Sequence, residues 1–165
     1  MSKKDSKLTI ERLRQVLKYE PATGNFFWVH RDTHKSKLGK QASIIRSHGY
    51  LSVCIDSVYY YTHRLVWMYV NGRMPDVIDH INGNKQDNRI ENLRSVDQKT
   101  NAENVVKPRK HNKSGLIGAY KAKNKFKSKI KIDGKYVYLG MFETPEDASQ
   151  AFIEMKRKHH VGCTI

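Results

Sequence analysis

An adjacent aspartate and histidine, Asp79 and His80, stand near the start of the stretch IDHINGNKQDNRIENLRSVDQKTNAEN, residues 78–104. An imidazole titrates close to working pH and can accept a proton, and a carboxylate is a hard oxygen donor for a divalent cation. Six asparagines share this stretch, although asparagine favours turns and caps over helices and strands. The stretch is therefore either a long polar loop or a compact site that side-chain amides hold together.

Short elements around this stretch determine which of its side chains can meet. A strand at 77–78 leads into the Asp-His pair, Asn82-Gly83 is a turn signal, and a second strand begins with the run LRSV at 93–96. Asp97 can then cap a short helix. Strand, loop, strand and helix in this order would bring together four side chains, those of Asp79, His80, Asn92 and Asn101.

With these residues in this order, the stretch resembles the HNH endonuclease family, whose site is a beta-beta-alpha-metal (His-Me finger) motif. The matching positions are Asp79-His80, the pair Asn92-Leu93, and Asn101. The flanking runs HRLVW, DHINGN, DNR and ENLR are similar to the phage and intron-homing branch of the family. The resemblance covers residues 40–104 and, more loosely, the first predicted helix.

The resemblance implies a role for each of the four residues. His80 would be the general base, Asp79 and Asn101 would hold a divalent cation, and Asn92 would brace the loop and orient the histidine. The last histidine of the family motif is asparagine here, so the set is H-N-N. Two oxygen ligands favour magnesium, or manganese, and disfavour zinc.

Some of the other polar residues of this region have two interpretations. Asn82, Asn84 and Asn88 are interpreted as turn formers. Arg89 and Arg94 could reach phosphate or could be solvated surface. His63, which precedes an apolar run, is interpreted as a core histidine bonded to a backbone carbonyl, with a functional role as the alternative.

The C-terminal part of the chain shows a different pattern. In KFKSKIKI, residues 125–132, lysines alternate with mostly apolar residues, which predicts a strand with one cationic face. Asp133-Gly134 predicts a two-residue hairpin turn into a partner strand. Thr144-Pro145 predicts the start of a helix whose apolar face would cover the other side of the sheet.

This second pattern is similar to the Apetala/ethylene-response-factor DNA-binding domain, a three-stranded antiparallel sheet backed by one helix. Gly118, the alternating strand, the run YLG and the "F-x-T-x-E-x-A" run carry the resemblance over residues 113–155. In that family the sheet lies in the major groove, and arginine reads guanine in a way that lysine and tyrosine cannot copy. The DNA-binding residues that the resemblance implies are Tyr120, Lys123, Lys125, Lys127, Lys129, Lys131, Tyr136 and Tyr138.

The remaining elements are predicted from periodicity and turn residues. Thr9 can cap a helix that would run to the neighbourhood of Glu20-Pro21, followed by a strand in FFWV. A hairpin is expected over 51–61 and a buried helix over 62–71, with Gly72 as its stop.

The composition narrows the partners. Lys and Arg outnumber Asp and Glu by 31 to 16 in 165 residues, a net charge of +15, and residues 105–165 contain 14 basic and 5 acidic residues, a net charge of +9. Such an excess favours nucleic acid, with an anionic membrane surface as the alternative. The longest apolar run, LVWMYV, is too short to span a bilayer. The two cysteines have no zinc-site spacing, so we expect free thiols, no structural zinc and a cytoplasmic protein, in the host cell if phage-encoded.

Together these patterns predict an α+β protein with an HNH domain at 1–104 (core about 76–104), a basic linker at 105–114 and a DNA-binding domain at 115–165. The predicted function is magnesium-dependent cleavage of double-stranded DNA by one protein molecule at a long asymmetric site, by nicking and without membrane association. The alternatives are a DNA-binding regulator with an inactive HNH fold, and a binder of single strands or RNA that stacks bases on its tyrosines.

Overall fold

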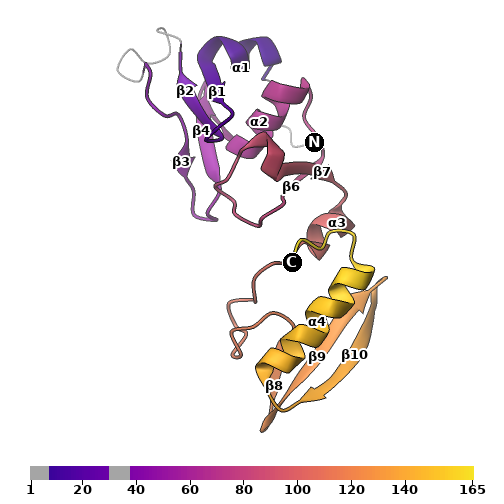
Figure 1. The fold of residues 1–165 in the computed structure, drawn as a ribbon. Coiled ribbons are helices and arrows are strands. Elements are labelled where there is room, and N and C mark those ends of the chain that lie inside the picture. The colour runs from indigo at the N-terminus through magenta and orange to yellow at the C-terminus, as the bar shows by residue number, and fades with distance from the viewer. Residues whose placement is uncertain (1–7, 30–37) are drawn as a thin grey trace. The chain divides into compact units, whose positions relative to one another are not determined.

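The computed structural model describes residues 8–29 and 38–165. The chain divides into two compact units, Met1–Asp97 and Gln98–Ile165. Both units combine helices with antiparallel strands (Figure 1), which confirms the predicted α+β class.

The first unit consists of short elements around one apolar core. Its helices are α1 (Ile10–Val16), α2 (Thr62–Asn71) and the 3-10 helix η2 (Ile90–Asn92). Its strands are β1 (Leu17–Glu20), β2 (Asn25–Trp28), β3 (Ile44–Ile45), β4 (Leu51–Ile55), β5 (Val58–Tyr61), β6 (Val77–His80) and β7 (Leu93–Val96). They pair as the hairpin β1-β2, the sheet β3-β4-β5 and the hairpin β6-β7.

The first helix is shorter than predicted. Thr9 caps α1 by accepting a hydrogen bond from the Arg12 amide, as expected, but the helix ends at Val16. The next residues form β1, in which Leu17 and Tyr19 are buried and alternate with exposed neighbours. Residues 17–20 pair with β2 and therefore adopt the two-residue alternation of a strand. This pairing overrides the helical spacing of their apolar residues.

The buried helix α2 and the hairpin before it agree with the predictions. β4 and β5 meet at a turn in which Asp56 and Ser57 both have positive φ, and Gly72 ends α2 in the left-handed conformation. Leu65 and Val66 of α2 are fully buried with Leu13 of α1 and Phe26 of β2. This core supports the hairpin β6-β7 that contains Asp79 and His80.

The second unit is a three-stranded sheet covered by one helix. It contains α3 (Gln98–Glu103), β8 (Ala119–Ala122), β9 (Lys125–Ile132), β10 (Lys135–Phe142) and α4 (Pro145–His159). The strand order is β10-β9-β8, and α4 lies along one face of the sheet (Figure 1). The predicted turn at Asp133-Gly134 and the predicted cap at Thr144, which accepts from the Asp147 amide, are both present.

The boundary between the units differs from the predicted one at 104. α3 belongs to the second unit because it packs against the C-terminal end: the Glu103 carboxylate accepts from the Gly162 amide at 3.3 Å, and Thr164 bonds to Asn104. The expected linker at 105–114 also folds onto this unit, since the buried Lys156 ammonium donates to the Val105 carbonyl at 2.6 Å. The basic segment is therefore part of a domain and not a spacer.

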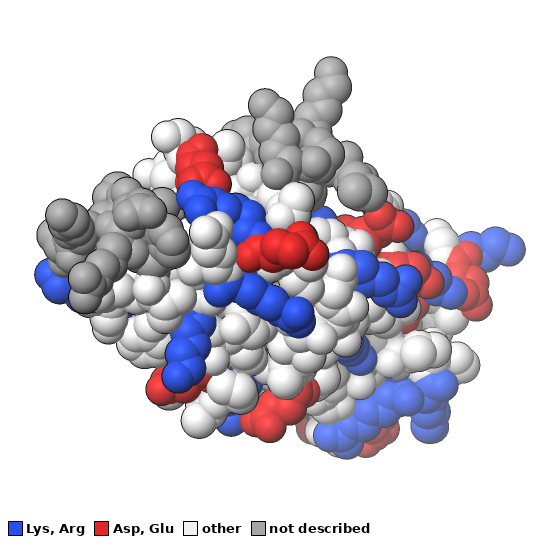
Figure 2. All heavy atoms as spheres, turned by 90° about the horizontal axis from the view of Figure 1, so that it is seen from above, with Lys and Arg blue, Asp and Glu red and all other residues white. Residues whose placement is uncertain are grey.

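Opposite charges lie close together on the surface. Acidic side chains stand beside lysines and arginines on the face seen in Figure 2. In the first unit, for example, the Arg12 guanidinium bonds to both oxygens of Asp56, at 2.7 and 3.0 Å. None of the helices within residues 8–29 and 38–165 has the length and apolar character that crossing a bilayer requires.

Candidate active site

The hairpin β6-β7 positions the predicted catalytic pair. Asp79 and His80 are the last two residues of β6, opposite Arg94 and Leu93 of β7. Successive side chains of a strand point to opposite faces, so the carboxylate and the imidazole project on different sides of the hairpin. Both residues are buried, with 7% and 5% of their surface exposed.

Side-chain amides brace the loop that joins the two strands. The Asn92 amide donates to the Asp87 carbonyl at 2.8 Å and accepts from the Asn82 backbone N–H at 3.0 Å. The Asn82 side chain in turn donates to the Asp87 carboxylate and accepts from the Asn84 amide, both at 2.8 Å. The asparagine-rich stretch is therefore a compact, amide-braced loop, and the Asn92 side chain bonds to two of its backbone groups.

A different asparagine contacts the histidine. Asn88 is 1% exposed, and its Oδ1 lies 3.1 Å from His80 Nε2. Its Nδ2 donates to the Gln86 carbonyl at 3.2 Å, which orients the amide so that the oxygen faces the imidazole. In this arrangement Nε2 carries the proton and Nδ1 is the basic nitrogen. Asn88, interpreted from sequence as a turn former, is thus the residue that orients His80.

Tyr19, from the hairpin β1-β2, holds the loop in place from outside. Its hydroxyl donates to the Asn88 carbonyl at 3.2 Å and accepts from the Ile90 amide at 3.1 Å. Nothing in the sequence near Asp79 indicates this contact, because its partners are separated by about seventy residues. A tyrosine in a strand is ordinarily read as an apolar core residue, so sequence reasoning missed it.

Aromatic rings surround His80. The His63 ring packs edge-on against it, with centroids 5.1 Å apart, and the Tyr50 ring lies at 6.0 Å. Burial lowers the pKa of His80, and burial together with the neighbouring His80 lowers the pKa of His63 to about 3. Both imidazoles are therefore neutral at neutral pH. Among the described residues, the buried His63 Nδ1 has no hydrogen-bond partner, so the expected carbonyl contact from this atom is absent.

Two arginines that were candidates for phosphate contact lie against carboxylates. Arg94 donates to Asp79 Oδ2 from Nε at 3.0 Å and from Nη2 at 2.8 Å. Arg89 forms a two-pronged ion pair with Asp87, at 2.8 and 2.7 Å, and this hydrogen-bonded pair lowers the pKa of Asp87 to about 2. Arg89 therefore stiffens the loop, whereas Arg94 stands beside the predicted metal ligand.

The donor set agrees in type with a hard cation but is divided between the units. Asp79 supplies a carboxylate in the first unit, and Asn101 is an exposed residue of α3 in the second. Within the described residues, no group of three or more His, Cys, Asp or Glu side chains could hold a metal ion. A site of one carboxylate, one amide oxygen and several waters suits magnesium, which keeps much of its hydration shell.

The residues predicted to bind DNA lie on and around the sheet of the second unit. The lysines at 125, 127, 129 and 131 are all exposed, as the alternation predicted, and Tyr136 and Tyr138 are 69% and 62% exposed. Cross-strand pairing puts Tyr136 opposite Lys131, Tyr138 opposite Lys129, and Tyr120 opposite Lys127. Lys123 lies in the turn between β8 and β9, and Lys125 forms an ion pair with Glu143.

Comparison with known proteins supports one part of this description. Residues 60–104 match the family model described as HNH endonuclease, and this range contains Asp79, His80, Asn88, Asn92 and Asn101. Comparisons with curated proteins and with solved structures gave no match. The match supports an HNH nuclease module, and with it a divalent metal and a DNA substrate.

Proposed function

We propose that this protein is a divalent-metal-dependent DNA endonuclease that hydrolyses a phosphodiester bond at the His80 site. The observation that carries the proposal is a buried, neutral imidazole whose orientation is set by Asn88, within the segment that matches HNH endonucleases. A neutral histidine with a fixed ring is what a general base needs, because it must accept a proton at working pH.

In the proposed reaction, His80 accepts the proton of the attacking water at Nδ1, and Asn88 keeps the ring in place from Nε2. Asn92 acts indirectly, by bracing the loop. Asp79 and Asn101 would hold magnesium or manganese. When bound, the cation supplies charge that neutralises the phosphate and the leaving oxygen.

The second unit is proposed to hold duplex DNA through its cationic sheet, in the manner of the Apetala/ethylene-response-factor domains. A nuclease module joined to an unlike DNA-binding module suits a long asymmetric target bound by one chain, as in homing endonucleases of phages and introns. A protein molecule has one Asp79-His80 site, and one such site cleaves one strand at a time. The proposed product is therefore a nick. Two-fold symmetric cleavage would need a second copy.

One observation favours a second candidate, a DNA-binding regulator without nuclease activity. The Arg94 guanidinium neutralises the Asp79 carboxylate that would bind the metal. In the nuclease, cation binding must displace or share this contact. In the regulator, the ion pair would be permanent.

Incubation with supercoiled plasmid distinguishes the two candidates. The parent protein with magnesium should give open-circle DNA, and omission of the metal should prevent it. His80→Ala should lower the rate by about 10²- to 10⁴-fold while DNA affinity, measured by gel shift, stays nearly the same. Binding without cleavage by the parent protein under any divalent metal would establish the regulator instead, and linear product formed at once would rule out nicking by one chain.

A further inference from the structure

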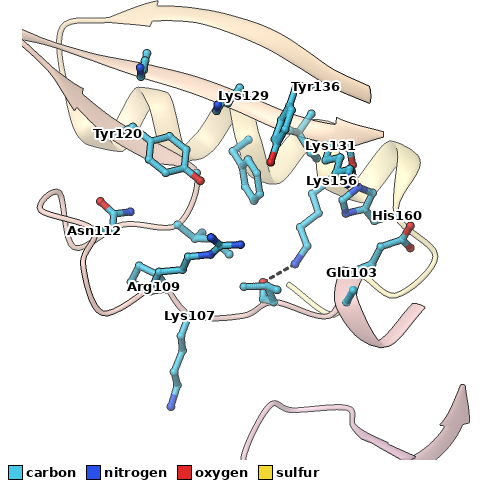
Figure 3. Close-up of a pocket in the computed structure, with 18 residues that line it drawn as sticks. Glu103, Lys107, Arg109, Asn112, Tyr120, Lys129, Lys131, Tyr136, Lys156 and His160 are labelled. Carbon is cyan, nitrogen blue, oxygen red and sulfur yellow. Dashed lines mark hydrogen bonds between the residues drawn. The ribbon is translucent and has the colours of Figure 1, made fainter. Parts of the chain in front are cut away.

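A pocket of about 560 Å³ lies within the second unit, beside the central strand of the sheet (Figure 3). β8 pairs with β9 only between Lys125 and Ser128. Beyond Ser128 the edge of β9 on this side has no strand partner among the described residues. Here the pocket opens, between β9, the end of α4 and the segment 105–112.

The segment 105–112 is a fixed wall of this pocket. Lys156, on α4, is 1% exposed and donates to the Val105 carbonyl at 2.6 Å. At the other end of the wall, the Asn112 side chain donates to the Leu116 carbonyl at 2.7 Å and accepts from the Ser114 amide at 3.0 Å. Contacts at both ends indicate that the pocket is formed before any ligand binds.

The charge of the lining is strongly positive. The cationic residues are Lys107, Arg109, Lys127, Lys129, Lys131 and Lys156. The acidic lining residue is Glu103, and its carboxylate accepts a hydrogen bond from Gly162. Cations gathered around a hollow repel one another, and an anion bound there would relieve this repulsion.

Donors without partners point into the hollow. Figure 3 shows the Arg109 guanidinium and the hydroxyls of Tyr120 and Tyr136 directed toward its interior, whereas Lys107 points away. Within the described part of the chain, the Arg109 guanidinium forms no ion pair and no hydrogen bond, and neither tyrosine hydroxyl forms a hydrogen bond. A guanidinium presents a planar fork of donors that matches the oxygens of a phosphate.

The other walls are aromatic and apolar. Phe152 of α4 and Ile130 of β9 line the pocket beside the two tyrosine rings. Aromatic faces bind nucleobases by stacking, and this interaction tolerates any base. The volume lies in the range of pockets that hold small molecules, about 300–1,000 Å³.

We propose that this pocket binds one nucleotide, with its phosphate on Arg109 and the hydroxyls of Tyr120 and Tyr136 and its base against the aromatic wall. The inference deepens the proposed function and rests on it, because the nucleotide would belong to the bound DNA. Tyr120 and Tyr136 then act in a pocket at the edge of the sheet. Tyr138, which is absent from the pocket lining, stays on the open face.

Calorimetric titration of the full-length protein tests the proposal with thymidine 5′-monophosphate, thymidine and a short single-stranded oligonucleotide. Arg109→Ala should weaken binding of the phosphorylated ligands by about tenfold or more, as expected for loss of a charged hydrogen bond. Lys110→Ala is the control, because it removes the same charge from the adjacent residue, which is exposed and outside the pocket lining. It should change the affinity less than about twofold. Tyr120→Phe should weaken binding severalfold.

The pattern of ligands that bind distinguishes a site for free nucleotides from a site for a nucleotide within a strand. Binding of the mononucleotide, and not of thymidine, supports a site open to free nucleotides as well as to DNA. Binding of the oligonucleotide alone, with the same dependence on Arg109, supports a site for a nucleotide within a strand. Equal losses in Arg109→Ala and Lys110→Ala would reduce the effect to diffuse charge and overturn the proposal. Plasmid cleavage, measured separately, tests the nuclease function independently of these affinities.

Discussion

At the scale of single residues, the site depends on two asparagines with different tasks. Asn92 bonds to the backbone on both sides of the loop, and Asn88 faces the His80 ring. Removal of Asn92 would loosen the loop as a whole. Removal of the Asn88 side chain would change the orientation of the His80 ring and the position of its proton on Nε2.

We expect Asn88→Ala to lower the cleavage rate by about tenfold or more, since general-base catalysis is worth about 10²- to 10⁴-fold and depends on geometry. DNA affinity should stay nearly constant, because Asn88 is buried and uncharged. Single-turnover cleavage and gel shift measure the two quantities. Asn84→Ala is the matched control, an exposed asparagine of the same loop. Similar losses in both variants would contradict a specific contact with His80.

The pH dependence of cleavage should reflect the lowered pKa of His80. The base works only when neutral, so the rate should rise with pH and level off once the imidazole has lost its proton. Because burial lowers this pKa below its ordinary value of about 6.5, the midpoint should lie below that pH. Single-turnover rates at saturating DNA would show it. A midpoint above about 6.5 would mean that another group limits the reaction.

At the scale of elements, the hairpin β1-β2 is a support for the asparagine-rich loop between β6 and β7. Gly24, in the turn of this hairpin, has φ of +75°, and a Cβ there would lie 2.5 Å from Asn88 C and from Arg89 N. The backbone at Gly24 therefore lies so close to the backbone at Asn88 and Arg89 that no side chain fits between them. The same hairpin contributes the Tyr19 hydroxyl to this loop.

Gly24→Ala should consequently destabilise the protein and disturb cleavage together. Gly39→Ala is the matched control, since Gly39 has φ of +74° with nothing within 4 Å of a Cβ. Both changes carry the left-handed strain of about 1–2 kcal/mol, and Gly24→Ala adds a clash of about 1–3 kcal/mol. Chemical denaturation measures the difference in the free energy of unfolding. Equal losses in the free energy of unfolding would show that the hairpin β1-β2 is not in tight contact with the loop.

At the scale of the whole molecule, the positive charge is concentrated in the C-terminal part. Residues 105–165 supply +9 of the net +15, and their lysines alternate along β9. In the first unit, arginines such as Arg89 and Arg94 already form ion pairs with aspartates. The second unit is therefore the main source of attraction for a polyanion.

Double substitution of Lys127 and Lys129 by glutamine should lower the salt dependence of DNA binding. Each lost phosphate contact removes about 0.9 from the slope of log affinity against log salt, so the expected change is about two units. Substitution of Arg157 and Lys158, exposed on α4, removes the same charge and should leave the slope nearly unchanged. Equal slopes for both double variants would show that the lysine face does not contact DNA.

Short-range patterns in the sequence determined much of this protein. The turn at Asp133-Gly134, the cap at Thr144 and the exposed lysines of β9 follow from residue types at fixed spacing, because turns, caps and strand alternation depend on neighbours a few positions away. The position of Asp79 and His80 at the end of a strand, before an asparagine-rich loop, was predicted in the same way.

Only the tertiary structure decided the contacts between distant segments. The end of α1 at Val16 depends on pairing with β2, the place of the segment at 105–114 depends on Lys156, and the loop's support depends on Tyr19. Asn88 has the same residue type as its neighbours in the loop, and burial against other segments is what directs it to His80. Local sequence does not specify such contacts, because their partners meet only when the core has formed.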